Sequence, residues 1–189
     1  MKTICRFIFW LTGWKVVGDM PEGIDKCVII VAPHTSGWDS WIGRMAFKIQ
    51  GLEGKFLVKD SFFWFPLGHI IKTLGGIPIN RKHANIVPLA VQCFNHNKRF
   101  ILLMTPEGTR AWVKEWKRGF HYIALQANVP VVFGFLDYRK KEVGFLPVSP
   151  FKVTCDFKKD LMEIYEIYKA ANLTAKYPEK FNLSAMYNK

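Results

Sequence analysis

A histidine and an aspartate follow a short apolar run, and together these two residue types can act as an acid–base pair. His34 and Asp39 come directly after residues 28–31, which read Val-Ile-Ile-Val and are typical of a buried strand that Pro33 ends. Histidine is the usual general base near neutral pH, because its unperturbed pKa is about 6.5. A carboxylate that accepts from one ring nitrogen fixes the tautomer and stabilises the imidazolium form.

The spacing of this pair sets a geometric condition. Five residues of continuous helix turn through about 500°, which would place His34 and Asp39 on different faces. The side chains can meet only if His34 precedes a helix and Asp39 lies in its first turn. Ser36 is a suitable N-cap for a helix over residues 37–50, and Asp39 then completes a capping box. Spacing alone also allows, and by itself favours, an Asp39 that only caps the helix beside an ordinary loop histidine.

Polar side chains also follow two other predicted strands, at the point where each strand ends. They are Arg81, after a turn and short strand at 75–80, and Glu107, Thr109 and Arg110, after an apolar strand at 100–104. The exits of parallel strands lie along one edge of a sheet, so we expect these groups to converge on His34.

The basic residues at strand exits fit an anionic substrate. Arginine suits phosphate through its planar fork, so Lys59, Arg81 and Arg110 are candidate anion contacts; the alternative is solvated surface charge. The chain has no Gly-x-Ser-x-Gly elbow, no phosphate-binding loop and no dinucleotide fingerprint. With no obvious protein nucleophile, a base that activates a substrate hydroxyl is the simpler chemistry.

Alternating strands and helices must position these residues. Strands are predicted at residues 28–32, 56–58, 100–104 and 129–135, with a short strand within 75–81 and edge strands at 143–146 and 151–154. Helices are predicted at residues 37–50, 66–73, 84–97, 119–127 and 160–171. This alternation indicates an α/β fold, with one domain over residues 18–189 built on a mixed, largely parallel sheet flanked by helices.

Residues 1–17 form a separate feature, predicted as one apolar and basic helix. Its aromatic side chains and flanking cations fit an interfacial membrane anchor, and equally a helix packed on the domain. The net charge of +12 favours a polyanionic partner, either nucleic acid or an anionic membrane. No stretch approaches the roughly 20 apolar residues of a membrane-spanning helix. The cysteines are far apart and lack zinc-type spacing, so we expect reduced thiols and no metal site.

Four segments, in this order, make the chain resemble the glycerolipid acyltransferases, the family that includes bacterial 1-acyl-glycerol-3-phosphate acyltransferase. Residues 34–39 fit the family's His-x4-Asp block, and residues 75–81 resemble Gly-x-x-Phe-x-x-Arg. Residues 105–110 resemble Phe-Pro-Glu-Gly-Thr-Arg, and residues 129–132 resemble the fourth block, Val-Pro followed by apolar residues. One His-x4-Asp is weak support, whereas four blocks in order at family-like spacing are strong.

The resemblance implies a reaction and a set of roles. His34 would deprotonate the acceptor hydroxyl, which attacks an acyl thioester, and Asp39 would orient His34. The acceptor's phosphate would be bound by a site that Arg81, Glu107, Gly108, Thr109 and Arg110 shape, with Lys59 as a further contact. Family members need no metal or cofactor; the acyl group arrives on coenzyme A or acyl carrier protein. They lie on the membrane, which implies a peripheral protein at its cytoplasmic face.

Departures from the family blocks leave the acceptor open. Pro78 replaces an aromatic residue, Thr105 a phenylalanine, and Phe133 a frequent second proline. These loops hold the polar headgroup, so an acceptor other than 1-acyl-glycerol-3-phosphate, such as a lyso-aminolipid, is an alternative. A non-catalytic basic protein that binds lipid or nucleic acid is a third interpretation. No nucleic-acid motif is present and the basic residues form no single stripe, so we expect no nucleic-acid partner.

Overall fold

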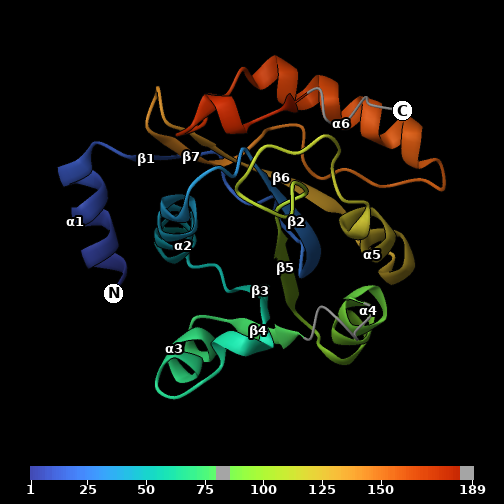
Figure 1. The fold of residues 1–189 in the computed structure, drawn as a ribbon, viewed down its shortest axis with the longest axis horizontal. Helices are drawn as coiled ribbons and strands as arrows, with labels where there is room; N and C mark the ends of the chain where they lie inside the picture. Colours follow the sequence, from blue (N-terminus) through green and yellow to red (C-terminus); the bar gives the residue numbers. More distant parts are fainter. Residues whose placement is uncertain (80–85, 184–189) are drawn as a thin grey trace.

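A largely parallel sheet runs through the centre of the molecule (Figure 1). The structure, a computed structural model, describes residues 1–79 and 86–183. The strands in these residues are β1 (Lys15–Val17), β2 (Lys26–Ala32), β3 (Gly54–Lys59), β4 (Gly76–Ile79), β5 (Phe100–Met104), β6 (Val131–Asp137) and β7 (Glu142–Phe145). They pair in the order β1-β7-β6-β2-β5-β3-β4, and of these described pairings β6–β7 alone is antiparallel. The predicted α/β fold with a mixed, largely parallel sheet is confirmed.

Helices cover both faces of the sheet. They are α1 (Lys2–Thr12), α2 (Gly37–Gln50), α3 (Leu67–Thr73), α4 (Ile86–His96), α5 (Gly119–Ala127) and α6 (Phe157–Ala171), with short 3-10 turns at Asp60–Phe62 and Pro178–Lys180. Buried side chains of α4, α5 and α6 pack in one core cluster, and those of α1 and α2 pack against the other face. Helix α3 lies beside β4 at the edge of the sheet (Figure 1).

The central strand β2 explains why the apolar run before His34 is unbroken. Val28 and Ile30 belong to the cluster under α4, α5 and α6, whereas Cys27 and Ile29 face the opposite cluster. All four are fully buried. A strand that is covered on both faces needs apolar side chains at every position, and burial of each one stabilises the fold by about 1.5–3 kcal/mol.

The N-terminal prediction was wrong in its extent. Helix α1 ends at Thr12, and Gly13 closes it in the left-handed conformation with φ of 76°. Residues Lys15–Val17 instead form β1, which pairs in parallel with β7. Glycine adopts this conformation without a steric penalty, and the β-branched Val16 and Val17 suit a strand.

The predicted edge strands are also corrected. Strand β7 lies inside the sheet between β1 and β6, so residues 143–146 are not an edge. Residues 151–154 form only one isolated bridge, from Phe151 to Val131. The backbone N–H of Thr154 donates instead to the Asp160 carboxylate, at 2.6 Å, and is therefore not available for a ladder.

Several predicted elements agree closely with the structure. The bounds of α2, β5 and α5 match, while α6 begins at Phe157 rather than at residue 160 because Asp156 caps it through the Lys159 N–H. The start of the helix predicted at 84–97 lies outside the described residues. Within the described ranges, none of the helices combines the length and apolar character needed to cross a bilayer.

Candidate active site

His34 and Asp39 meet where β2 leaves the sheet. Strand β2 ends at Ala32, so His34 precedes α2, and Asp39 lies in the first turn of that helix. The His34 Nδ1 atom is 3.2 Å from Asp39 Oδ2, and the two side chains are 15% and 1% exposed. This is the geometry that the spacing requires, and it leaves the imidazole reachable from solvent while the carboxylate is buried.

Asp39 is held by several donors besides His34. Its Oδ2 atom accepts from the backbone N–H groups of Thr35 and Ser36, each at 2.8 Å, and Oδ1 accepts from the Tyr138 hydroxyl at 2.5 Å. Burial raises the pKa of Asp39, but the hydrogen bonds from His34, Tyr138 and Ser36 outweigh burial and the net direction is downward. Asp39 therefore stays ionised, and it caps α2 and orients His34 at the same time.

Tyr138 belongs to the site although sequence reasoning missed it. It directly follows β6, 99 residues away from Asp39 in the chain. Burial, followed by the hydrogen bond to Asp39 and the charge of Asp39, raises the pKa of Tyr138. The phenol consequently stays protonated and acts as a donor. No spacing in the sequence signals this contact, because it depends on how β6 lies against β2.

Glu107 lies beneath His34 rather than in an open site. It is buried, and its Oε1 atom accepts from the backbone N–H of His34 at 3.2 Å. Its Oε2 atom has no hydrogen-bond partner within the described part of the chain. Burial raises the pKa of Glu107 to about 8; the N–H of His34 opposes this shift and the charge of Asp39 adds to it. Glu107 is thus mostly protonated at neutral pH and holds the backbone that carries the histidine.

The rest of the Glu-Gly-Thr-Arg loop turns outward. Gly108 has φ of 68°, and its N–H donates to the Thr105 carbonyl at 3.0 Å, which closes a turn that favours glycine. The Thr109 hydroxyl accepts from the Ala111 N–H at 3.3 Å. Of the predicted site residues in this loop, Arg110 lines the cavity described next.

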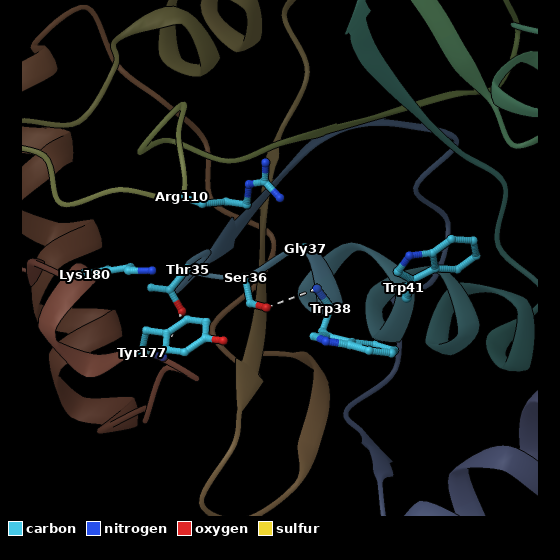
Figure 2. A pocket seen from close by; sticks show the side chains of 8 residues that line it. All are labelled: Thr35, Ser36, Gly37, Trp38, Trp41, Arg110, Tyr177 and Lys180. Atoms are coloured by element: carbon cyan, nitrogen blue, oxygen red, sulfur yellow. Dashed lines mark hydrogen bonds between the residues drawn. The ribbon is translucent and has the colours of Figure 1, made fainter. Parts of the chain in front are cut away.

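A cavity of about 510 Å³ opens next to the His–Asp pair (Figure 2). The loop before α2 and the start of that helix form one wall, including Thr35, Trp38 and Trp41. Arg110, Tyr177 and Lys180 complete it, and Figure 2 shows Arg110 and Lys180 on the side away from the tryptophans. His34 itself is not among the lining residues, but Thr35, its neighbour in the chain, is.

Lys59 is a predicted anion contact that is not part of the lining of this cavity. Lys59 ends β3 at the same edge of the sheet, but β5 separates β3 from β2 and Lys59 does not line the cavity. Arg81 lies outside the described residues. The contributions of Lys59 and Arg81 stay predictions.

The C-terminal part of the site was not foreseen. No site role was predicted for the residues after α6, yet the Tyr177 N–H donates to the Thr35 hydroxyl at 3.2 Å. The aromatic and basic residues Lys176, Tyr177 and Lys180 are the signal in the sequence that could have pointed to this segment. In the described residues, no group of three or more His, Cys, Asp and Glu side chains is placed to hold a metal.

Comparisons with known proteins identify the family of this chain. The family model described as "Acyltransferase" matches residues 16–132. Two curated relatives are named 1-acyl-sn-glycerol-3-phosphate acyltransferase: one from Limnanthes alba is 29% identical over 135 residues, and one from Limnanthes douglasii is 28% identical over 135 residues. These alignments cover 66% of this chain and 46% of each relative, so the chain spans about half the length of the curated proteins.

A solved structure shares the fold. The crystal structure of the 1-acyl-sn-glycerophosphate acyltransferase from Thermotoga maritima superposes with a TM-score of 0.61, covering 93% of this chain and 80% of that chain at 16% identity. The family model spans well over half of the chain and includes the His34–Asp39 pair and the Arg110 loop. This chain therefore belongs to the acyltransferase family.

Proposed function

We propose that the protein transfers a fatty acyl group from an acyl thioester to the hydroxyl of a lysophospholipid-like acceptor, 1-acyl-glycerol-3-phosphate first among them. The observation that carries the proposal is the contact between His34 and the ionised, buried Asp39 next to a cavity with basic side chains. The names of the curated relatives support the choice of acceptor.

In the proposed reaction, His34 acts as the general base through Nε2, since Nδ1 faces Asp39. The acceptor hydroxyl attacks the thioester carbonyl while the imidazole takes its proton. A C–O bond forms, the C–S bond breaks, and the proton passes from the imidazolium to the leaving thiolate. Asp39 stabilises the imidazolium, and general base catalysis of this kind contributes about 10²–10⁴-fold to a rate.

The charge of the acyl donor suits a basic protein. The donor is acyl coenzyme A or acyl carrier protein, each of which is anionic, and the formal net charge of this chain is +12. No metal or cofactor takes part in the proposed mechanism, because base and leaving group are supplied by His34 and the thioester.

We place the protein at the cytoplasmic face of a membrane, as a peripheral protein that contacts lipid through α1. Cys5 and Phe9 of α1 are buried against the domain, whereas the large side chains on its other side are exposed: Ile4, Phe7, Trp10 and Leu11. A helix with one packed side and one exposed apolar side fits an interfacial segment. Flotation with anionic vesicles tests this; binding that persists in a Trp10→Ser/Leu11→Ser variant would refute it.

The catalytic proposal is tested with the full chain and its His34→Ala variant. Radiolabelled acyl donor is incubated with 1-acyl-glycerol-3-phosphate, and unlabelled lyso-aminolipid is added as a competitor. We expect labelled diacyl product from the wild type and almost none from the variant. Undiminished turnover by a folded His34→Ala variant would refute the mechanism. If the wild type acylates the lyso-aminolipid and not 1-acyl-glycerol-3-phosphate, the acceptor is the lyso-aminolipid.

A further inference from the structure

We propose that the C-terminal segment, residues 174–180, forms a wall of the acceptor site and that Lys180, together with Arg110, binds the phosphate monoester of the acceptor. The inference rests on the proposed function and deepens it. The family model ends at residue 132, so this segment lies outside the matched blocks.

Backbone hydrogen bonds fix the C-terminal segment beside the catalytic pair. The Tyr138 N–H donates to the Thr174 carbonyl at 2.8 Å, and the Tyr177 N–H donates to the Thr35 hydroxyl at 3.2 Å. Tyr138 is also the donor to Asp39, and Thr35 follows His34. The segment is thus attached at two points, each of which adjoins a member of the proposed acid–base pair.

The segment brings cations to the cavity. Lys180 lines the cavity opposite α2, and its Nζ lies 4.3 Å from the centroid of the Tyr177 ring. Lys176 Nζ lies 5.3 Å from the Trp38 ring centroid at the rim. Arg110 approaches from the loop after β5. Its Nη1 atom lies so close to Gly37 that a Cβ atom added to that glycine would be 3.1 Å away. In Figure 2 the Lys180 amine points toward Thr35.

Within the part of the chain that the structure describes, these positive charges lack carboxylate partners. Across the described ranges, no ion pair involves Arg110, Lys176 or Lys180, although Glu179 is adjacent in the chain. Like charges gathered around one cavity repel one another, and an anion between them removes that repulsion. A phosphate monoester is the anion that fits best, because its two charges match an arginine fork and a lysine point charge.

The size and lining of the cavity agree with this ligand. A volume of about 510 Å³ lies within the range of small-molecule sites, which is roughly 300–1,000 Å³. The exposed rings of Trp38 and Trp41 lie on the side of the cavity away from Arg110 and Lys180 and offer an apolar surface to the glyceryl ester and the start of the acyl chain. A phosphodiester headgroup, with a single charge, would gain less from the paired cations.

A kinetic experiment compares Lys180→Gln with Lys158→Gln, which removes the same charge from an exposed site on α6 away from the cavity. The acceptors are 1-acyl-glycerol-3-phosphate, the matching lysophosphatidylcholine and 1-monoacylglycerol. We expect Lys180→Gln to raise the KM for the monoester acceptor about tenfold with little change in kcat, as loss of one charge-assisted hydrogen bond predicts. The KM for 1-monoacylglycerol should not change, Lys158→Gln should match the wild type, and Lys180→Arg should recover most of the loss.

The donor is the other source of a phosphate monoester, because coenzyme A carries one on its ribose. The KM for the acyl donor is therefore measured in the same variants, with acyl coenzyme A and with acyl carrier protein. A rise in the KM for acyl coenzyme A alone would assign the site to the donor and overturn the proposal. Equal losses in Lys180→Gln and Lys158→Gln would also overturn it.

A binding experiment separates this inference from the proposed activity. Calorimetry measures binding of glycerol 3-phosphate and inorganic phosphate to the His34→Ala chain and to the His34→Ala/Lys180→Gln chain. Binding by the first that weakens about tenfold in the second supports the site, even if the wild type transfers no acyl group and the proposed function fails. Equal binding by the two, or none by the first, would refute the site even if acyl transfer is observed.

Discussion

His34 and Asp39 meet at the exit of β2, whereas His121 and Asp160 meet between α5 and α6. The second contact is the shorter, with His121 Nε2 2.8 Å from Asp160 Oδ2, and both of its side chains are 1% exposed. Asp160 also accepts from the Thr154 N–H and hydroxyl, and the Phe157 ring lies 5.0 Å from the imidazole. The distance within a His–Asp pair therefore does not identify an active site.

Access distinguishes the two pairs. The His34 side chain retains 15% exposure beside a cavity, and within the described residues its Nε2 has no hydrogen-bond partner, so a substrate hydroxyl can reach it. The Nδ1 atom of His121 is also unpartnered in the described structure, but it is buried among aromatic rings. The first pair is therefore the one that is placed for the proposed proton transfer, and the second joins two helices and the loop before α6.

The comparison predicts opposite losses when each histidine is removed. His34→Ala should lower kcat by about 10²–10⁴-fold, because the variant lacks the proposed general base. Its free energy of unfolding should change little, since Asp39 keeps its bonds from Tyr138, Thr35 and Ser36. Turnover assays and urea denaturation of the same preparation measure both quantities. A large loss of stability would mean that this pair is structural.

His121→Ala should instead reduce the free energy of unfolding by about 3–5 kcal/mol, the typical cost of removing one partner from a buried pair. Activity per folded molecule should remain within a few-fold of wild type, because the cavity is not touched. Urea denaturation measures the loss, and active-site titration normalises the turnover. A His121→Ala chain of wild-type stability would show that the buried contact contributes nothing.

Glu107, which lies beneath His34, should make the stability of the protein depend on pH. Its pKa is raised from 4.5 to about 8, so its contribution to stability is fully present below pH 4.5 and is lost as the pH rises through 8. Glu107→Gln copies the protonated side chain and removes this dependence. We expect the wild type to lose stability relative to Glu107→Gln between pH 5 and 8, by at most about 1.4 kcal/mol per pH unit. Parallel stability curves for the two proteins would show that Glu107 is ionised throughout.

Tyr138→Phe should give the smallest effect. Loss of the hydroxyl removes one hydrogen bond from Asp39, worth about 0.5–1.5 kcal/mol, so kcat/KM should fall roughly two- to tenfold. The same bond helps to lower the Asp39 pKa, so the pKa of Asp39 should rise in the variant, which an NMR titration of its carboxyl carbon measures. Tyr122→Phe, on α5 and away from the cavity, is the matched control. An unchanged Asp39 pKa together with unchanged kcat/KM would show that the Tyr138 hydroxyl does not act on the site.

Local features of the site could be read from the sequence. The apolar run of β2, the capping box of Ser36 and Asp39, and the bounds of α2 and β5 follow from hydrophobic pattern and cap chemistry, which act over a few residues. The condition that His34 precede the helix is also local. The order of four motif blocks indicated the family, although Arg81 of the second block lies outside the described residues.

Burial and long-range contacts were decided by the tertiary structure. Tyr138 reaches Asp39 across 99 residues, and the C-terminal segment reaches Thr35 across 142. Glu107 has the residue type of a site carboxylate, but packing places it under His34 and keeps it mostly protonated. The sequence by itself therefore determined that His34 and Asp39 can meet at the end of β2. Only the fold decided what surrounds them, because the register of β2 against β5 and β6 sets which distant side chains arrive there.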